Sequence, residues 1–162
     1  MLRAIRVSGT ANHRSVANEA GLDDTVYLED AGADWKAAWN ITEALLVQMN
    51  KDILDRKRRF LVVVLSNGIQ VDPQAERTNA FIQERGILNE FTPDYRVRRF
   101  GLKHGFDVLV LAPSLQKIAR ERKSYLHGFG DNLGRGHWNQ NGHRAAAEII
   151  AAYLCNAHIP FR

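Results

Sequence analysis

The sequence predicts an α/β protein built on a parallel sheet that helices cover. Two continuous apolar runs, residues 60–65 and 106–111, are bounded by polar or turn-forming residues and lack the alternation of a half-exposed strand. Segments with helical spacing lie before, between and after these runs. Buried strands separated by helices are typical of parallel sheets with crossover connections.

Length and composition indicate one domain, residues 1–162, with an ordinary core. The chain is 45% hydrophobic and 25% charged, which is typical of a soluble globular protein. Its one cysteine, Cys155, cannot form an intrachain disulfide. No apolar run approaches the roughly 20 residues that span a bilayer, and no signal peptide is recognisable. We therefore expect no membrane partner and, by default, a cytoplasmic protein.

The first part of the chain, residues 1–33, is poorly defined by its pattern. Short strands are expected at residues 4–7 and 25–28. The segment between them, residues 8–21, is polar and small without a clear period, so we expect a mobile loop.

A long amphipathic helix is predicted from Asp34 onward. Apolar residues recur there at three- and four-residue steps for about five turns, with Asp34 as the expected N-cap. The basic residues 57–59 suit the negative end of the helix dipole. Trp35 and Trp39, one turn apart, are expected to anchor the core.

Residues that commonly begin and end helices mark the later elements. Asp72 and Pro73 are expected to begin a helix that Gly86 ends. Gly105 is expected to end the following helix. Further helices are predicted over residues 93–103, 114–123 and 141–155.

The segment most informative about chemistry is the glycine-rich stretch at residues 125–139. It precedes a helix N-terminus, whose positive dipole end disfavours a proton on a nearby imidazole. His137 is therefore a candidate general base that stays neutral near pH 7. The alternative is that His137 only hydrogen-bonds across the loop while Trp138 fills the core.

The block Gly136-His137-Trp138-Asn139, followed by Gly142-His143 and an Ala-rich helix, resembles the last motif block of the SGNH (GDSL-like) ester hydrolases. The order of elements over residues 34–155 resembles that family too. The resemblance implies a three-layer flavodoxin-like sandwich and an ester or acetylated-sugar substrate, with no cofactor. It also implies that His137 takes the proton from a nucleophilic serine.

The chain departs from the pattern of that family in three places. The Gly-Asp-Ser block and the Gly-x-Asn-Asp block are both absent, and Gly134 stands where the family has an aspartate. Asp131 is an alternative partner that could orient the imidazole, or else an exposed loop residue. We therefore expect the chain to be the C-terminal portion of such a domain, incomplete at its N-terminus and inactive alone.

Three further residues are candidates at the carboxyl edge of the sheet. Asn139 is expected to brace the loop through its side-chain amide. Ser66 and Ser114 each follow a predicted strand and are weaker candidates for the nucleophile. Their alternatives are turn hydrogen bonding for Ser66 and helix N-capping for Ser114.

Metal and nucleic-acid functions are disfavoured. His137 and His143 are six residues apart rather than at the four-residue spacing of helical metal pairs. The net charge of +4 is modest, and the basic clusters are expected to be solvated faces rather than a specific nucleic-acid site. The second candidate function is a non-catalytic α/β binding module. Loss of a front half would expose apolar surface and favour self-association.

Overall fold

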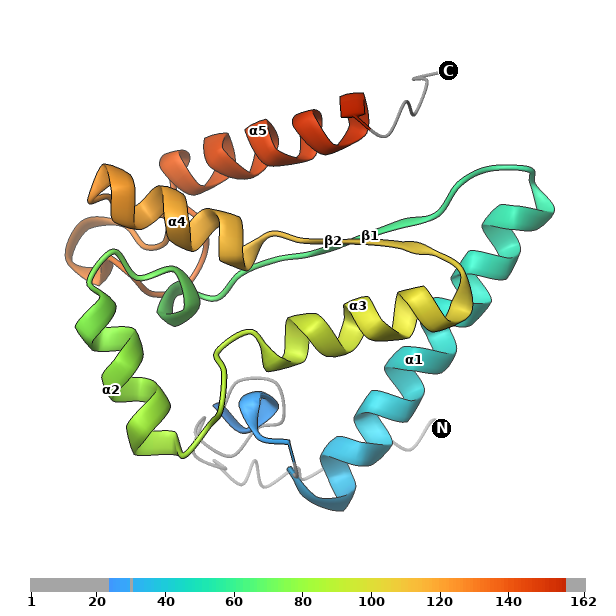
Figure 1. The fold of residues 1–162 in the computed structure, drawn as a ribbon, viewed down its shortest axis with the longest axis horizontal. Helices are drawn as coiled ribbons and strands as arrows, with labels where there is room; N and C mark the ends of the chain where they lie inside the picture. Colours follow the sequence, from blue (N-terminus) through green and yellow to red (C-terminus); the bar gives the residue numbers. More distant parts are fainter. Residues whose placement is uncertain (1–23, 30, 157–162) are drawn as a thin grey trace, which may run out of the picture.

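Two parallel strands, β1 (Leu61–Val64) and β2 (Asp107–Val110), form the centre of the computed structural model (Figure 1). The structure describes residues 24–29 and 31–156. Leu61 pairs with Asp107 and Val64 with Val110, so the strands run in parallel and in register. The expected α/β class with a parallel sheet is confirmed.

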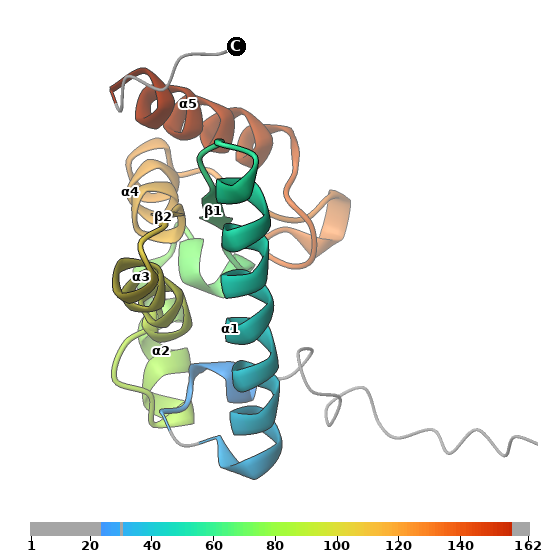
Figure 2. The same ribbon diagram turned by 90° about the vertical axis from the view of Figure 1, so that its right-hand side faces the viewer.

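Helices lie on both sides of the strands. α4 and α5 lie on one side, and α2 and α3 on the other, whereas α1 runs past the end of the sheet where the strands begin (Figures 1 and 2). The α-helices are α1 (Gly32–Asp55), α2 (Ala75–Arg85), α3 (Thr92–His104), α4 (Ala112–Arg122) and α5 (Gln140–Asn156), and the 3-10 helices are η2 (Asp24–Tyr27), η3 (Gly68–Val71) and η4 (Gly130–Asn132).

The glycine stop signals are confirmed. Gly86 and Gly105 cap α2 and α3 with φ of 62° and 73°, a left-handed conformation that glycine adopts without steric cost.

Several expected helix starts are wrong. α1 begins at Gly32, so Asp34 lies in its first turn, and Ser114 lies inside α4 rather than at its N-cap. Ala31 and Leu111 are the N-caps of these helices, and neither forms a side-chain cap hydrogen bond, so neither start depends on a polar capping residue. Asp72 precedes α2 by a short bend, in which its carboxylate accepts a hydrogen bond from the backbone N–H of Gln74 at 2.9 Å.

The strand expected at residues 25–28 is also wrong, because this segment forms η2 and a turn. The backbone N–H of Leu28 donates to the carbonyl of Thr25 at 3.0 Å. The Tyr27 side chain is buried edge-on against Phe81, at 5.4 Å between ring centroids, which favours a curled segment over an extended one. The expected strand 4–7 and loop 8–21 lie outside the described residues.

The core lies between β2, η3, α4 and α5. Its central side chains come from the end of β2, from α4 and from the glycine-rich segment that precedes α5. Its buried members are Val71, Phe91, Leu111, Ala112, Leu115, Ala119, Leu126, Ala145 and Ala146. This packing surrounds the carboxyl ends of the strands and therefore gives that end of the sheet its rigid framework.

Strand β1 and helix α1 are less buried than the sequence predicts. The residues of β1 are half-buried, and Leu65, just after it, is 59% exposed. Asn50 is the one buried residue of α1, and Ile41 is 63% exposed. Strands are buried on both faces where helix layers cover both faces of the sheet. The two-stranded sheet that the described residues form leaves its strands at an edge, where the cover is incomplete.

The tryptophans of α1 are not core anchors, contrary to expectation. Trp35 and Trp39 are both half-buried, and the guanidinium of Arg96 lies 4.4 Å from the Trp39 ring centroid. Trp39 thus packs against a charged side chain through a cation–π contact, and not against the apolar side chains of the core. Self-association through exposed apolar surface stays a prediction. No helix in the described part of the chain is long and apolar enough to span a membrane.

We expect Leu115→Ala to lower the free energy of unfolding by about 2–5 kcal/mol, because it empties space at the centre of the core. Leu115 is fully buried, whereas Leu88 is 80% exposed. Leu88→Ala is therefore the matched control, with an expected change below about 0.5 kcal/mol. Urea unfolding of both variants measures the difference, and equal effects would contradict the position of the core.

Candidate functional site

The site is built around the turn that follows β1. The backbone N–H of Asn67 donates to the side-chain oxygen of Gln70 at 2.7 Å, and the Gln70 amide donates to the Asp94 carboxylate at 2.7 Å. The Gln70 amide also donates to the carbonyl of Glu90 at 2.9 Å. These bonds tie the first turn of η3 to α3 and hold the residue before Asn67, Ser66, at the carboxyl end of β1.

Ser66 lies in a continuous chain of hydrogen bonds. Its Oγ is 3.1 Å from Nε2 of His127 and 3.0 Å from the indole nitrogen of Trp138. On the far side of the imidazole, Nδ1 of His127 lies 2.7 Å from the carbonyl oxygen of Gly136. A serine hydroxyl and an imidazole that are 61 residues apart in the sequence are therefore direct partners.

The chemistry of the two ends determines the direction of every bond in this chain. An indole nitrogen can only donate, and a backbone carbonyl can only accept. Nδ1 of His127 therefore carries the ring hydrogen and donates it to Gly136. Nε2 is left as an acceptor for the Ser66 hydroxyl, whose oxygen accepts from Trp138. This is the arrangement in which an imidazole can take a proton from an alcohol.

Burial keeps the His127 ring neutral. His127 is 3% exposed and Ser66 is 7% exposed. Burial lowers the pKa of His127 below its ordinary value of 6.5, and the nearby His137 ring acts in the same direction. The hydrogen bond to the Gly136 carbonyl acts in the opposite direction but is the weaker influence. The ring is therefore available as a base at neutral pH.

The glycine-rich segment folds back on itself to place His127. The backbone N–H of Gly128 donates to the carbonyl of His137 at 2.9 Å, and the N–H of Gly134 donates to the carbonyl of His127 at 2.9 Å. Gly128 has a φ of 83°, and a Cβ there would lie 1.9 Å from the carbonyl oxygen of Asn132. A glycine is therefore required at the point where the loop closes.

Asn139 forms hydrogen bonds in two directions. Its amide nitrogen donates to the carbonyls of Tyr125 at 2.9 Å and Gly128 at 3.3 Å. Its side-chain oxygen accepts from the backbone N–H groups of Asn141 at 3.0 Å and Gly142 at 3.1 Å, in the first turn of α5. The side chain thus links the start of the loop to the helix that follows it.

Of the two serines proposed as nucleophiles, the structure pairs one with an imidazole. Ser66 contacts His127, whereas Ser114 is exposed in the first turn of α4. The expected base, His137, is exposed, and its ring makes no hydrogen bond within the described part of the chain. Asp131 is exposed on η4 and forms no ion pair with the described residues, so no carboxylate orients either imidazole.

Sequence reasoning missed His127. Its neighbours, Leu126 and Gly128, place it at the apolar start of the glycine-rich segment. Neighbouring residues do not specify whether this ring faces inward or into solvent. Its contact with Ser66 depends on how the loop returns to β1, so no local signal predicts it.

The neighbouring carboxyl of Asp94 is also perturbed. Burial raises the pKa of Asp94 to about 6, and the hydrogen bond from Gln70 acts in the opposite direction. One of its oxygens, Oδ1, has no hydrogen-bond partner among the described residues. Asp94 therefore takes up its proton at a higher pH than an ordinary carboxyl, near pH 6.

The described residues contain no group of three or more His, Cys, Asp or Glu side chains placed to hold a metal ion. Fold and site together define an α/β protein with a buried serine–histidine pair at the carboxyl edge of a parallel sheet. Comparison of the chain with protein-family models, curated proteins and solved structures finds no match.

We expect the neutral His127 ring to carry its hydrogen on Nδ1 and to titrate below pH 6.5, because burial disfavours its charged form. Long-range proton–nitrogen NMR spectra report both properties, and the resonance missing from His127→Gln assigns the ring. A hydrogen on Nε2, or a titration above pH 6.5, would contradict the direction of the hydrogen bonds.

The lowered pKa of His127 also makes the free energy of unfolding depend on pH. Below about pH 6.5 the unfolded chain binds a proton at His127 that the folded chain does not, so the free energy of unfolding falls as pH falls. Asp94 acts in the opposite direction from about pH 6 downward, because its folded carboxyl takes up a proton first. Comparing the wild type with His127→Gln isolates the histidine contribution.

We expect Asn139→Ala to lower the free energy of unfolding by about 1–3 kcal/mol, because it removes a helix cap and two bonds to loop carbonyls. Asn132→Ala is the control, since the Asn132 side chain is exposed and forms no hydrogen bond with the described residues. Urea unfolding compares the two variants. Equal and small changes would show that Asn139 does not hold the loop.

Proposed function

We propose that the chain is a serine ester hydrolase in which Ser66 is the nucleophile and His127 is the general base. The observation that carries this proposal is the 3.1 Å contact between Ser66 Oγ and His127 Nε2, with Nδ1 bound to the Gly136 carbonyl. Such a pair is the minimal arrangement for acyl transfer through a serine. The chemistry needs no cofactor.

The reaction follows from the direction of the hydrogen bonds. Ser66 Oγ attacks the ester carbonyl carbon while its proton passes to His127 Nε2. The ester C–O bond then breaks, and the imidazolium returns the proton to the departing alcohol, leaving an acyl group on Ser66. Water attacks this acyl group with the same base, and the acid is released as Oγ regains its proton.

The two ends of the hydrogen-bond chain support these steps. The Gly136 carbonyl orients the imidazole and favours its protonated form, as a carboxylate does in a catalytic triad, but with a dipole in place of a full charge. The indole N–H of Trp138 donates to Oγ, and this bond strengthens when Oγ becomes negatively charged.

The proposed function keeps the ester-hydrolase chemistry that the SGNH resemblance implies but assigns it to different residues. Helices on both sides of the parallel strands are compatible with part of a three-layer flavodoxin-like sandwich, and an ester or acetylated-sugar substrate suits that resemblance. The resemblance assigns the base to His137 and predicts an inactive chain. The hydrogen bonds favour His127 as the base instead, with a nucleophile within this chain.

A non-catalytic α/β module is the second candidate, and the burial of the pair favours it. At 7% and 3% exposure, Ser66 and His127 offer an ester little direct access. In this alternative the pair serves as a buried clamp that attaches the glycine-rich segment to β1.

We expect purified protein to hydrolyse 4-nitrophenyl acetate and to be labelled at Ser66 by a fluorophosphonate. Ser66→Ala should abolish both. His127→Gln should lower kcat/KM by about 10²–10⁴-fold, because it removes the base. Intact-mass and peptide mass spectrometry locate the label.

His137→Ala is the matched control and should keep the wild-type rate. Urea unfolding of each variant separates a lost base from a lost fold. Activity that depends on His137 and not on His127 would overturn the assignment of the base. A folded protein with neither turnover nor label would favour the non-catalytic module.

A further inference from the structure

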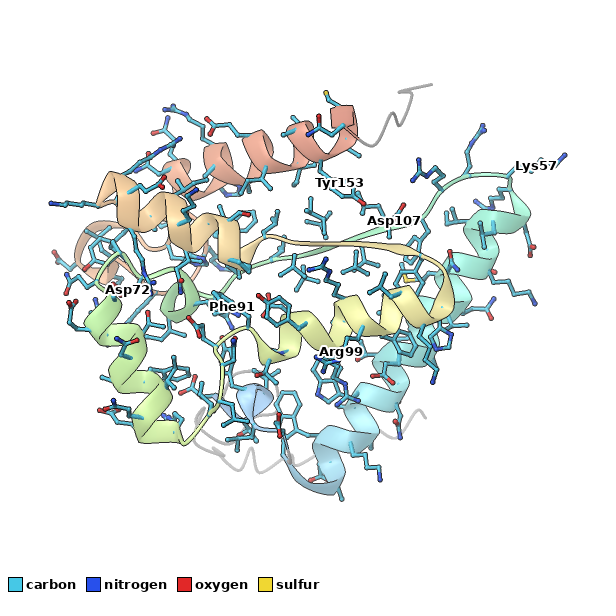
Figure 3. All side chains as sticks on the ribbon, viewed as in Figure 1. Lys57, Asp72, Phe91, Arg99, Asp107 and Tyr153 are labelled. Carbon is cyan, nitrogen blue, oxygen red and sulfur yellow. The ribbon has the colours of Figure 1, made fainter. Side chains whose placement is uncertain are left out.

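A groove of about 540 Å³ lies beside the serine–histidine pair. Two of its lining residues, Asn67 and Gly136, are the chain neighbour of Ser66 and the residue whose carbonyl binds His127. Asp72, another lining residue, lies beyond the carboxyl ends of the strands, at the end of the sheet opposite to Asp107 (Figure 3). The volume is within the range of small-molecule sites.

The acidic groups of the groove are already neutralised. The buried carboxylate of Asp72 is 3.2 Å from the guanidinium of Arg77, and the carboxylate of Asp24 is 2.9 Å from that of Arg85. Both acids thus have a cationic partner. They leave no unpaired negative charge in the groove among residues 24–29 and 31–156.

Within residues 24–29 and 31–156, Arg135 is the lining cation of the groove that has no ion-pair partner. Its side chain is exposed and forms no ion pair or hydrogen bond with the rest of the described chain. Gly134 and Gly136, on either side of Arg135, also line the groove, so this part of the glycine-rich segment forms one of its walls. A guanidinium with free N–H groups binds carboxylates with two parallel hydrogen bonds.

A second donor belongs to another residue of the groove lining. Tyr27 is a lining residue, and its hydroxyl accepts a hydrogen bond from the Asn67 amide at 2.9 Å. Its own hydrogen has no acceptor among the described residues. Burial raises the pKa of Tyr27 to about 12, so this hydroxyl remains a donor at neutral pH.

We propose that this groove binds the carboxylate of a monoanionic ester, with Arg135 as the cationic contact and Tyr27 as a donor. The inference rests on the proposed esterase function, because it identifies the substrate class of that site. A single unpaired guanidinium matches one negative charge, which favours a carboxylate over a dianionic phosphate. The substrate class is the half-ester of a dicarboxylic acid.

Monomethyl succinate and dimethyl succinate form a matched pair that differs by one negative charge. We expect a higher kcat/KM for the monoester, measured by titration of the acid released. Arg135→Gln should lower the monoester value about tenfold to a hundredfold and so remove the preference for the monoester over the diester. Arg98→Gln is the control, because Arg98 is exposed on α3 and does not line the groove.

Binding is measured separately from turnover with monomethyl succinate on the Ser66→Ala variant. Monomethyl succinate should shift the backbone amide resonances of Gly68, Gly134 and Gly136, and the added substitution Arg135→Gln should abolish these shifts. Tighter binding of inorganic phosphate than of monomethyl succinate would overturn the carboxylate assignment.

The two measurements distinguish the two proposals. Hydrolysis of both esters without any dependence on Arg135 would overturn the groove assignment and leave the esterase function in place. Binding of monomethyl succinate that depends on Arg135, without hydrolysis of either ester, would overturn the esterase function and leave a carboxylate-binding groove. Absence of both would overturn both.

Discussion

The arrangement of the site depends on a hydrogen-bond chain that can run in one direction only. It begins at the donor-only indole of Trp138, passes through Ser66 and His127, and ends at the acceptor-only carbonyl of Gly136. The side chains of Ser66 and His127 are both buried. Removing the hydrogen-bond partner of either one would therefore lower the free energy of unfolding by about 1–3 kcal/mol. The loop is therefore held to the end of β1, and the imidazole is held in one tautomer.

Packing is uneven, and the better-packed part carries the site. The core joins η3, α4, α5 and the start of the glycine-rich segment, all at the carboxyl ends of the strands. α1, which is nearest the viewer in Figure 2, has a single buried residue and contributes little to this core. A site that needs positions accurate to fractions of an ångström is thus built where side chains are interlocked.

Local sequence signals predicted the elements well and their environments less well. Gly86 and Gly105 end helices as expected, because a left-handed residue is favourable for glycine whatever surrounds it. The burial of β1 and the role of Trp39 were predicted wrongly, because both depend on what lies beyond the strand and the helix. The partners of the Asn139 side-chain oxygen, the backbone N–H groups of Asn141 and Gly142, are two and three residues away in the sequence. The position of Asn139 before α5 therefore indicated these hydrogen bonds.

The sequence by itself determined the α/β class, the parallel pairing of two apolar strands and a glycine-rich loop that carries polar side chains before the last helix. These features arise from neighbouring residues, through backbone preferences and hydrophobic patterning. The tertiary structure alone decided that His127 and not His137 meets Ser66, and that Arg135 lies at a groove wall without an ion-pair partner in the described part of the chain. The reason is that the path of the loop in space, which neighbouring residues do not specify, determines which side chains meet across 61 positions.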